Sequence, residues 1–261
     1  MRQCAFCPST KLTLEHIWGD WINGIVPQVT YTTQRKISLV DFAEPWTSVG
    51  IQQTAKVVCR ECNNHWMSDL ETQQAKPAMA DMIRHGGAVS LLPKGIASIS
   101  AWAFKMAVIA NFIGKLKNEP YFTQRERYDF AQTLRVPSGV QMWLFALNTP
   151  GRVIGKFNSH LGRFPTKTKY GFELYIATFA IGFFGIQVVA SRWMEPHLSA
   201  FLGRFPGLRQ DNKWNGVSVP VFPSDGSPVV WPPRFHLNSD SIEEFINRWK
   251  NIDVPTWVVG D

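Results

Sequence analysis

The side chains with the clearest chemistry are the four cysteines, which fall into two pairs with identical spacing. Cys4 and Cys7 form one Cys-x-x-Cys pair, and Cys59 and Cys62 form the other. Two such pairs are typical of a Cys₄ zinc site, in which four thiolates complete a closed tetrahedral shell. A closed shell leaves no open coordination position, so we expect a structural zinc ion. The competing interpretation is four free thiols.

Polar side chains with catalytic potential lie beside both pairs. Glu15 and His16 follow the first pair, and Asn63 comes directly after Cys62. An imidazole with an unperturbed pKa of about 6.5 can take a proton from water near neutral pH. The oxygens of Glu15 and Asn63 are hard donors suited to Mg²⁺ or Mn²⁺. Neighbours on a strand point to opposite faces, so a local distortion or a water must bring Glu15 and His16 to one site.

Each of these residues also has a purely structural interpretation. His16 could pack near the zinc ion, Glu15 could be a surface carboxylate, and Asn63 could serve only as a helix cap. His65 could face solvent or contact a phosphate without taking part in catalysis. A catalytic role is therefore favoured by the combination of these residues and not by any one of them alone.

The order of Cys4-x-x-Cys7, Glu15-His16-Ile17 and Cys59-x-x-Cys62-Asn63 resembles the HNH endonucleases, which have a ββα-metal fold. The resemblance covers residues 1–72, about a quarter of the chain. It implies hydrolysis of DNA phosphodiester bonds, with His16 as general base and a Mg²⁺ or Mn²⁺ ion held by Glu15 and Asn63. The remainder is similar to the long C-terminal extension of bacterial and phage HNH-type proteins.

The sequence departs from the family pattern at two positions. Thr54 stands where the family usually has the asparagine that orients the base, and Met67 stands where a second helix ligand is often found. Thr54 or a backbone carbonyl could orient His16 instead. These departures keep an alternative open, a zinc-stabilised nucleic-acid-binding or regulatory protein with an HNH fold that has lost cleavage. Residues that could support the site are Thr54, Asn64 and His65.

The charge of the chain is unevenly distributed. The net charge is +7, yet residues 1–72 hold 6 basic and 7 acidic side chains, while residues 73–261 hold 21 basic and 13 acidic ones. A basic surface attracts polyanions, most often nucleic acid. We therefore expect DNA, and double-stranded DNA in particular, as the partner. Solubility is the alternative reason for such a charge.

A short repeat lies in this basic region. Leu161-Gly162-Arg163-Phe164-Pro165 recurs as Leu202-Gly203-Arg204-Phe205-Pro206, and each copy is followed by further basic residues. We interpret the copies as two similar turns, each with a packed phenylalanine, or as two loops that grip phosphates. The candidate DNA contacts are Arg163, Lys167, Lys169, Arg204, Arg209 and Lys213.

Periodicity and turn residues predict the elements that position these side chains. Residues 1–18 should form a zinc knuckle and a β-hairpin, with a turn at 8–11 and a strand at 12–14. Residues 19–50 lack sustained periodicity and are interpreted as an insertion. Pro77 either interrupts a helix or starts the next. The other predicted elements up to residue 137 are a short helix near 18–22, strands at 36–40 and 55–58, and helices at 63–74, 78–84, 96–117 and 123–134.

From residue 138 the pattern is that of strands. The apolar run 174–190 is long, but its glycines and its β-branched and aromatic residues favour a hairpin around Gly182 over a membrane span. The proline-rich tail from 217 should wrap the surface as extended chain. The predicted elements are strands at 140–147, 152–157, 173–181 and 183–190 and a final helix from Asp240 or Ser241 to Lys250.

The sequence therefore predicts an α+β chain with a zinc-stabilised ββα module, a helical middle and a β-rich C-terminal region. The predicted domains are residues 1–75 with the insertion 19–50, then 76–137 and 138–261, of which the last two can form one domain. No charged-then-apolar segment opens the chain, and paired cysteines fit a reducing cytosol, so we expect a cytoplasmic protein without a membrane partner. A protein-interaction module is a third functional class, suggested by 11 tryptophans and the proline-rich tail.

Overall fold

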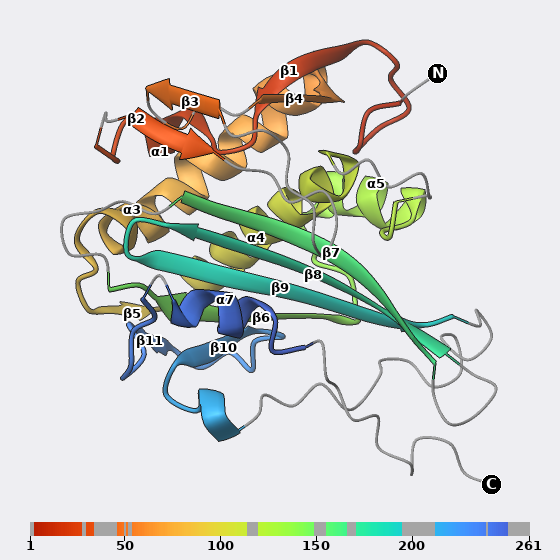
Figure 1. Ribbon diagram of the computed structural model, residues 1–261. Coiled ribbons are helices and arrows are strands. Elements are labelled where there is room, and N and C mark those ends of the chain that lie inside the picture. The colour runs from red at the N-terminus through yellow and green to blue at the C-terminus, as the bar shows by residue number, and fades with distance from the viewer. Residues whose placement is uncertain are drawn as a thin grey trace, which may run out of the picture.

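The computed structural model describes residues 3–27, 30–33, 46–49, 51, 54–113, 120–148, 155–165, 171–194, 212–238 and 240–249. It is a mixed structure of helices and antiparallel sheets, so the predicted α+β class is confirmed. Figure 1 shows a small N-terminal part, a layer of helices and a large curved sheet, one behind the other.

The N-terminal part is built on two strands that are distant in the sequence. β1 (Leu12–His16) pairs antiparallel with β4 (Thr54–Cys59), so that Leu12 lies opposite Cys59 and His16 opposite Thr54. The predicted hairpin within residues 1–18 is therefore wrong, because the partner of β1 is β4. The predicted strand at 55–58 is confirmed as β4.

One unbroken helical segment follows β4 directly. It consists of α2 (Arg60–Cys62), η1 (Asn63–Met67), η2 (Leu70–Ala75) and α3 (Lys76–His85), and η1 and η2 have π-helical hydrogen bonding. The helix predicted to end near residue 74 thus continues through Pro77, which lies in the first turn of α3. A wider π-helical turn just before a proline accommodates its missing N–H group. The segment ends at His85, one residue beyond the predicted end at 84, and Gly86 follows in the left-handed conformation.

The insertion between β1 and β4 contains α1 (Asp20–Asn23) and the antiparallel pair β2 (Thr30–Thr33) and β3 (Trp46–Val49). The short predicted helix is confirmed, the β2–β3 pair was not predicted, and the predicted strand at 36–40 lies outside the described residues. The Asn23 side chain ties the insertion back to the chain before β4. It accepts a bond of 2.8 Å from the Ile51 amide and donates one of 3.1 Å to the Ile51 carbonyl.

The large sheet has five antiparallel strands in the order β10-β6-β9-β8-β7. The β8–β9 hairpin turns at Gly182 as predicted, and its apolar residues are strands of the sheet. The bounds are β6 (Val140–Ala146), β7 (Gly155–Pro165), β8 (Gly171–Ile181), β9 (Phe184–Trp193) and β10 (Ser218–Phe222).

Helix α4 (Pro93–Ile113) is the central element of the fold. It contacts η2 and β4 on one side and strands of the large sheet on the other, as its place in Figure 1 suggests. It is apolar and long enough to cross a membrane, but 83% of that stretch is buried inside the protein, as expected of a core helix. The predicted helix at 123–134 is α5 (Gln124–Thr133), with a complete capping box between Thr123 and Glu126.

The C-terminal region differs from its prediction in two places. The proline-rich tail does not simply wrap the surface, because β10 forms an edge of the large sheet and β11 (Val229–Trp231) pairs with β5 (Val89–Leu91). Pro220 is tolerated because an edge strand has one side without partners. The first copy of the repeat is part of strand β7, so it is neither a turn nor a loop and both interpretations are wrong there. The second copy lies outside the described residues.

A short helix closes the far side of the sheet. The predicted final helix is α7 (Ser241–Ile246), preceded by the 3₁₀ turn η3 (Asn212–Trp214). These pack with Phe145 and Ala180 in a small apolar cluster. The main apolar core is one cluster that runs from Cys4 through α4 to Trp231 and draws residues from each of the three predicted domain spans.

The β8–β9 turn gives a test of this packing. Gly182 has φ +57°, and an added Cβ would lie 2.1 Å from the Ile83 carbonyl oxygen at the end of α3. We expect Gly182→Ala to lower the free energy of unfolding by about 2–4 kcal/mol, from backbone strain and forced separation of the turn from α3. Chemical denaturation measures this loss.

Gly226→Ala is the matched control. Gly226 also has a positive φ, +88°, but nothing lies within 4 Å of an added Cβ. Its cost should be that of the backbone alone, about 1 kcal/mol. Equal losses in the two variants would contradict the proposed contact between the turn and α3.

Candidate functional site

The two cysteine pairs meet in space. The sulfurs of Cys4, Cys7, Cys59 and Cys62 all lie within 4.8 Å of one another, and Cys7 Sγ is 3.5 Å from Cys59 Sγ. All four are free of disulfide bonds. The four thiols form a cluster that can hold one metal ion, and this is compatible with a structural zinc site. The cluster joins the loop before β1 to the start of the long helical segment.

Backbone amides point at the sulfurs. Cys4 Sγ accepts hydrogen bonds from the amides of Phe6 at 3.5 Å and Cys59 at 3.3 Å, and Cys59 Sγ accepts one from Cys62 at 3.5 Å. The Cys62 thiol, together with these amides, lowers the pKa of Cys4 to about 5. Donors of this kind stabilise a thiolate, which is the form that binds a metal.

An aromatic cluster supports the first cysteine loop. Phe6 and Trp66 pack edge to face at 5.0 Å between ring centroids, and Phe130 of α5 lies 6.3 Å from Phe6 and 5.7 Å from Trp66. These rings come from the loop, the long helical segment and α5. The cysteine loop therefore packs against aromatic rings that include one from α5, outside the first 75 residues.

Arg127 of α5 fixes the same loop through its backbone. Its guanidinium donates to the Ala5 carbonyl between Cys4 and Cys7, and its Nε donates to the Phe122 carbonyl at 3.0 Å. Arg127 is only 8% exposed, so these bonds are made in a buried setting. The position of α5 therefore matters to the metal cluster.

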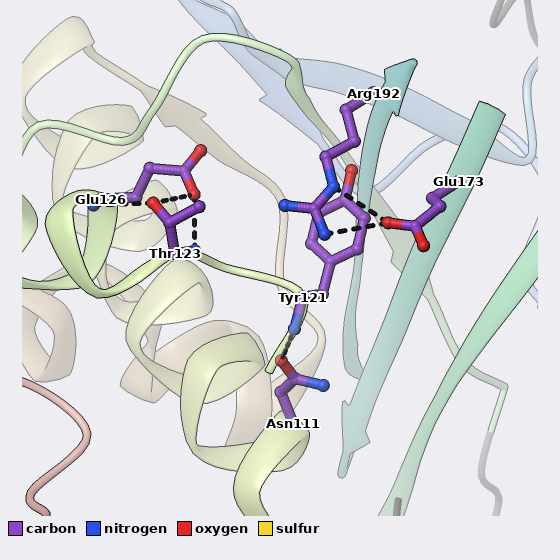
Figure 2. Close-up of polar contacts among 6 residues, drawn as sticks. All are labelled: Asn111, Tyr121, Thr123, Glu126, Glu173 and Arg192. Atoms are coloured by element: carbon purple, nitrogen blue, oxygen red, sulfur yellow. Dashed lines mark hydrogen bonds and ion pairs between the residues drawn. The ribbon is translucent and has the colours of Figure 1, made fainter. Parts of the chain in front are cut away.

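Figure 2 shows how the chain entering α5 is held. The Tyr121 amide donates to Asn111 Oδ1 at 2.6 Å, and the capping box of Thr123 and Glu126 starts α5. Arg192 of β9 lies over the Tyr121 ring at 4.3 Å and donates to Glu173 Oε2 of β8 at 2.8 and 3.0 Å. These two contacts of Arg192 join the chain before α5 to the sheet. The positive charge of Arg192 is therefore paired with Glu173 and the Tyr121 ring inside the protein.

Glu15 points inward from β1. The strand pairing is irregular between Thr13 and Glu15, and Glu15 is 6% exposed, whereas Leu14 is 68% exposed. The Asn63 side chain at the start of η1 donates a hydrogen bond to the Glu15 carboxylate. The predicted pair of oxygen donors is therefore brought together, one from each cysteine-linked segment.

The buried setting raises the pKa of Glu15 to about 7. Loss of water around the carboxyl group is the main cause, and the charges of Glu71 and Asp20 act in the same direction. Lys105 and the Asn63 hydrogen bond act against it. A carboxyl group with this pKa is half ionised near neutral pH, which is common at functional sites.

His16 lies on the other face of the strand, with 39% of its side chain exposed. Its Nδ1 is 3.0 Å from Asp20 Oδ1, on the first residue of α1. This partner was not predicted, and a His-x-x-x-Asp spacing across a strand-to-helix turn was the signal for it. Thr54 lies opposite His16 in the ladder and is exposed, so the carboxylate of Asp20 takes the place that was predicted for Thr54 or a carbonyl.

Two further charged residues lie close to Glu15 and were also not predicted. Lys105 of α4 is fully buried, and its ammonium group pairs with Glu71 of η2. A Cβ added at Gly19 would lie 2.0 Å from Glu71 Oε2, so this carboxylate packs against the turn between His16 and α1. The only sequence signal was a lysine in the middle of an apolar helix.

The remaining candidates are less closely linked to Glu15. Asn64 and His65 are exposed, and His65 Nδ1 lies 2.9 Å from the Glu61 carbonyl, one turn earlier on the helix. Lys213 pairs with Glu244 of α7 and lies 5.4 Å from the Trp214 ring centroid. Arg163 is in β7. The other DNA candidates, Lys167, Lys169, Arg204 and Arg209, lie outside the described residues.

Comparison with known proteins does not identify a relative. No protein family, curated protein or solved structure matches this chain. The candidate site consists of a four-sulfur cluster, a buried Glu15 with a partly buried Asn63, and a partly exposed His16 paired with an exposed Asp20.

The sulfur cluster predicts tight binding of one metal ion per chain. Cys59→Ser removes the ligand that lies on β4, so we expect loss of bound metal and a large fall in the unfolding midpoint, because metal binding is coupled to folding. Elemental analysis and thermal melts measure both effects. His65→Ala, an exposed neighbour, should keep its metal, and loss of metal in that variant would show that the ligand set is different.

The raised pKa of Glu15 predicts a pH-dependent cost of folding. An unfolded glutamate has a pKa near 4.5 and the folded one about 7, so ionising Glu15 destabilises the fold as the pH rises through this window. Glu15→Gln should therefore stabilise the protein at pH 8 by roughly 2–3 kcal/mol more than at pH 5. Denaturation of both proteins at the two pH values, without added Mg²⁺ or Mn²⁺, measures the difference. A pH-independent difference would exclude Glu15 as the titrating group.

Proposed function

We propose that this protein is a metal-dependent endonuclease of the HNH type that hydrolyses phosphodiester bonds in DNA. The observation that supports the proposal is that two antiparallel strands and a helix meet at four cysteines, with Glu15 and His16 on one strand and Asn63 at the start of the helical segment. We further propose that the ion in the sulfur cluster is zinc, which has a strong preference for four thiolates.

The Glu15–Asn63 pair fits a hard divalent cation. Both side chains carry oxygens, which are the ligands that Mg²⁺ and Mn²⁺ prefer, and Asn63 lies within hydrogen-bonding reach of Glu15. Such an ion would act as a Lewis acid on the phosphate and stabilise the leaving 3′ oxygen. Glu15 and Asn63 would hold it between the strand and the helix.

His16 is suited to act as the general base. Its Nδ1 faces Asp20, and this contact fixes the ring and leaves Nε2 as the nitrogen that can take a proton from water. A carboxylate beside the first nitrogen also stabilises the imidazolium ion that forms, as in other base–carboxylate pairs. The 39% exposure of the side chain gives water and substrate access to it.

The substrate is proposed from charge. The chain has a net charge of +7, concentrated after residue 72, and a polyanion is the partner that such a charge attracts. The second candidate function is binding without cleavage. It is favoured by Met67, which is buried in the helix at the place where the resemblance would put another ligand.

Nuclease activity predicts a specific dependence on His16. His16→Ala should lower the cleavage rate by about 10²–10⁴-fold, the usual contribution of a general base. Plasmid nicking assays with Mg²⁺ or Mn²⁺ measure the rate. His65→Ala should keep a rate within about threefold, since its ring is exposed and lies beside Glu61.

The same assays decide between the two functions. If the zinc-loaded protein binds DNA in a salt-dependent way but does not cleave it with Mg²⁺ or with Mn²⁺, its function is DNA binding without cleavage. Cleavage that is equal in wild type and His16→Ala would refute the assignment of the base.

A further inference from the structure

Lys105 is a charged residue in a place where charge is costly. It lies in α4 with no exposed surface, and its neighbours Phe104 and Met106 are equally buried. Its partner Glu71 is 8% exposed. A buried ion pair contributes little net stability compared with apolar residues of the same size, so its presence calls for a role other than stability.

The pair lies beside the turn that follows Glu15 and His16, since Glu71 Oε2 would be 2.0 Å from a Cβ added at Gly19. Lys105 and Glu71 are the two charges that act most strongly on the Glu15 carboxyl group, in opposite directions. Asp20 acts more weakly from the exposed rim, where it faces His16. The buried neighbourhood therefore holds two carboxylates and one ammonium group, a balance of one negative charge when Glu15 is ionised.

We propose that Glu71 and Lys105 set the affinity of the Glu15–Asn63 pair for a divalent cation. Glu71 binds the Lys105 ammonium group and so keeps it from pairing with Glu15, which leaves the Glu15 charge available to a Mg²⁺ or Mn²⁺ ion. The inference rests on the proposed function in one respect, that the Glu15–Asn63 pair is a cation site. Glu71 and Lys105 are positioning residues that act through Glu15.

The charge balance predicts whether each variant binds the cation more weakly or more tightly than wild type. Glu71→Gln leaves the Lys105 ammonium group facing the Glu15 carboxylate, and the two charges cancel. An incoming cation must then compete with the ammonium group for Glu15. Lys105→Met leaves two carboxylates. The double variant E71Q/K105M restores the original balance of one negative charge. A unit charge a few ångström from a divalent ion in a partly buried site changes its affinity by more than about tenfold.

The experiment is a titration of the zinc-loaded full chain with Mn²⁺ at pH 8. Binding is measured by calorimetry and by the electron paramagnetic resonance signal of free Mn²⁺. We expect at least about tenfold weaker binding in Glu71→Gln, tighter binding by a similar factor in Lys105→Met, and binding within about threefold of wild type in E71Q/K105M. Glu15→Gln should abolish this binding, which assigns the measured site.

Glu173→Gln is the matched control. It removes the nearly buried Glu173 carboxylate, which pairs with the partly exposed Arg192 on the sheet and is not among the charges that act on Glu15. Its Mn²⁺ affinity should equal that of wild type. Circular dichroism and zinc content show whether each variant is folded, and if Lys105→Met does not fold, Glu71→Gln against E71Q/K105M still decides the question.

Two outcomes would overturn the inference. If all variants bind Mn²⁺ with equal affinity, or if the wild type does not bind Mn²⁺, then the Glu71–Lys105 pair has no role in cation binding. Weak binding in both Glu71→Gln and the double variant would make Glu71 a direct ligand and not the counter-ion of Lys105. The failure of the nuclease proposal can be distinguished from these outcomes. If the Mn²⁺ affinities follow the expected order but DNA is not cleaved, the inference is supported and the proposed nuclease activity is refuted.

Discussion

The contact on which the N-terminal part depends is the meeting of four sulfurs. The β1–β4 ladder has two strands, and an isolated pair of strands is at best marginally stable in water. It must also close over an insertion of some 40 residues, which costs loop entropy. A metal ion, which Cys4, Cys7, Cys59 and Cys62 are placed to hold, would offset this cost at the point where strand becomes helix. The geometry of Glu15 and Asn63 follows, because each lies on one of the linked segments.

Much of this arrangement could be predicted because it is encoded locally. The cysteine spacing, the Thr123–Glu126 capping box and the turn at Gly182 are short-range patterns with a direct physical meaning, and the structure contains each of them. The partner of β1 could not be read from local pattern. A turn at residues 8–11 favours a hairpin, and only the long-range link through the cysteines selects β4 instead.

The missed parts of the candidate site are those whose partners are distant in sequence. Glu71 and Lys105 are 34 residues apart, and nothing in the pattern of an apolar helix tells where Lys105 will point. Asp20 is near His16 in sequence, but it meets His16 only because β1 ends and α1 begins at that turn. Likewise, the first copy of the repeat is in β7 because an 11-residue pairing with β8 outweighs its glycine and proline as turn signals.

Helix α4 connects the candidate site to the rest of the protein. It packs on the large sheet with its apolar residues and reaches Glu71 with Lys105 on its other side. Arg127 makes a second connection, from α5 to the first cysteine loop. The electrostatics of Glu15 and the position of the sulfur cluster are therefore set partly by elements beyond residue 75. A fragment that contained only the two strands and the helix would lack the Lys105 ammonium group and the Phe130 ring, so the charge around Glu15 and the packing of the first cysteine loop would both change.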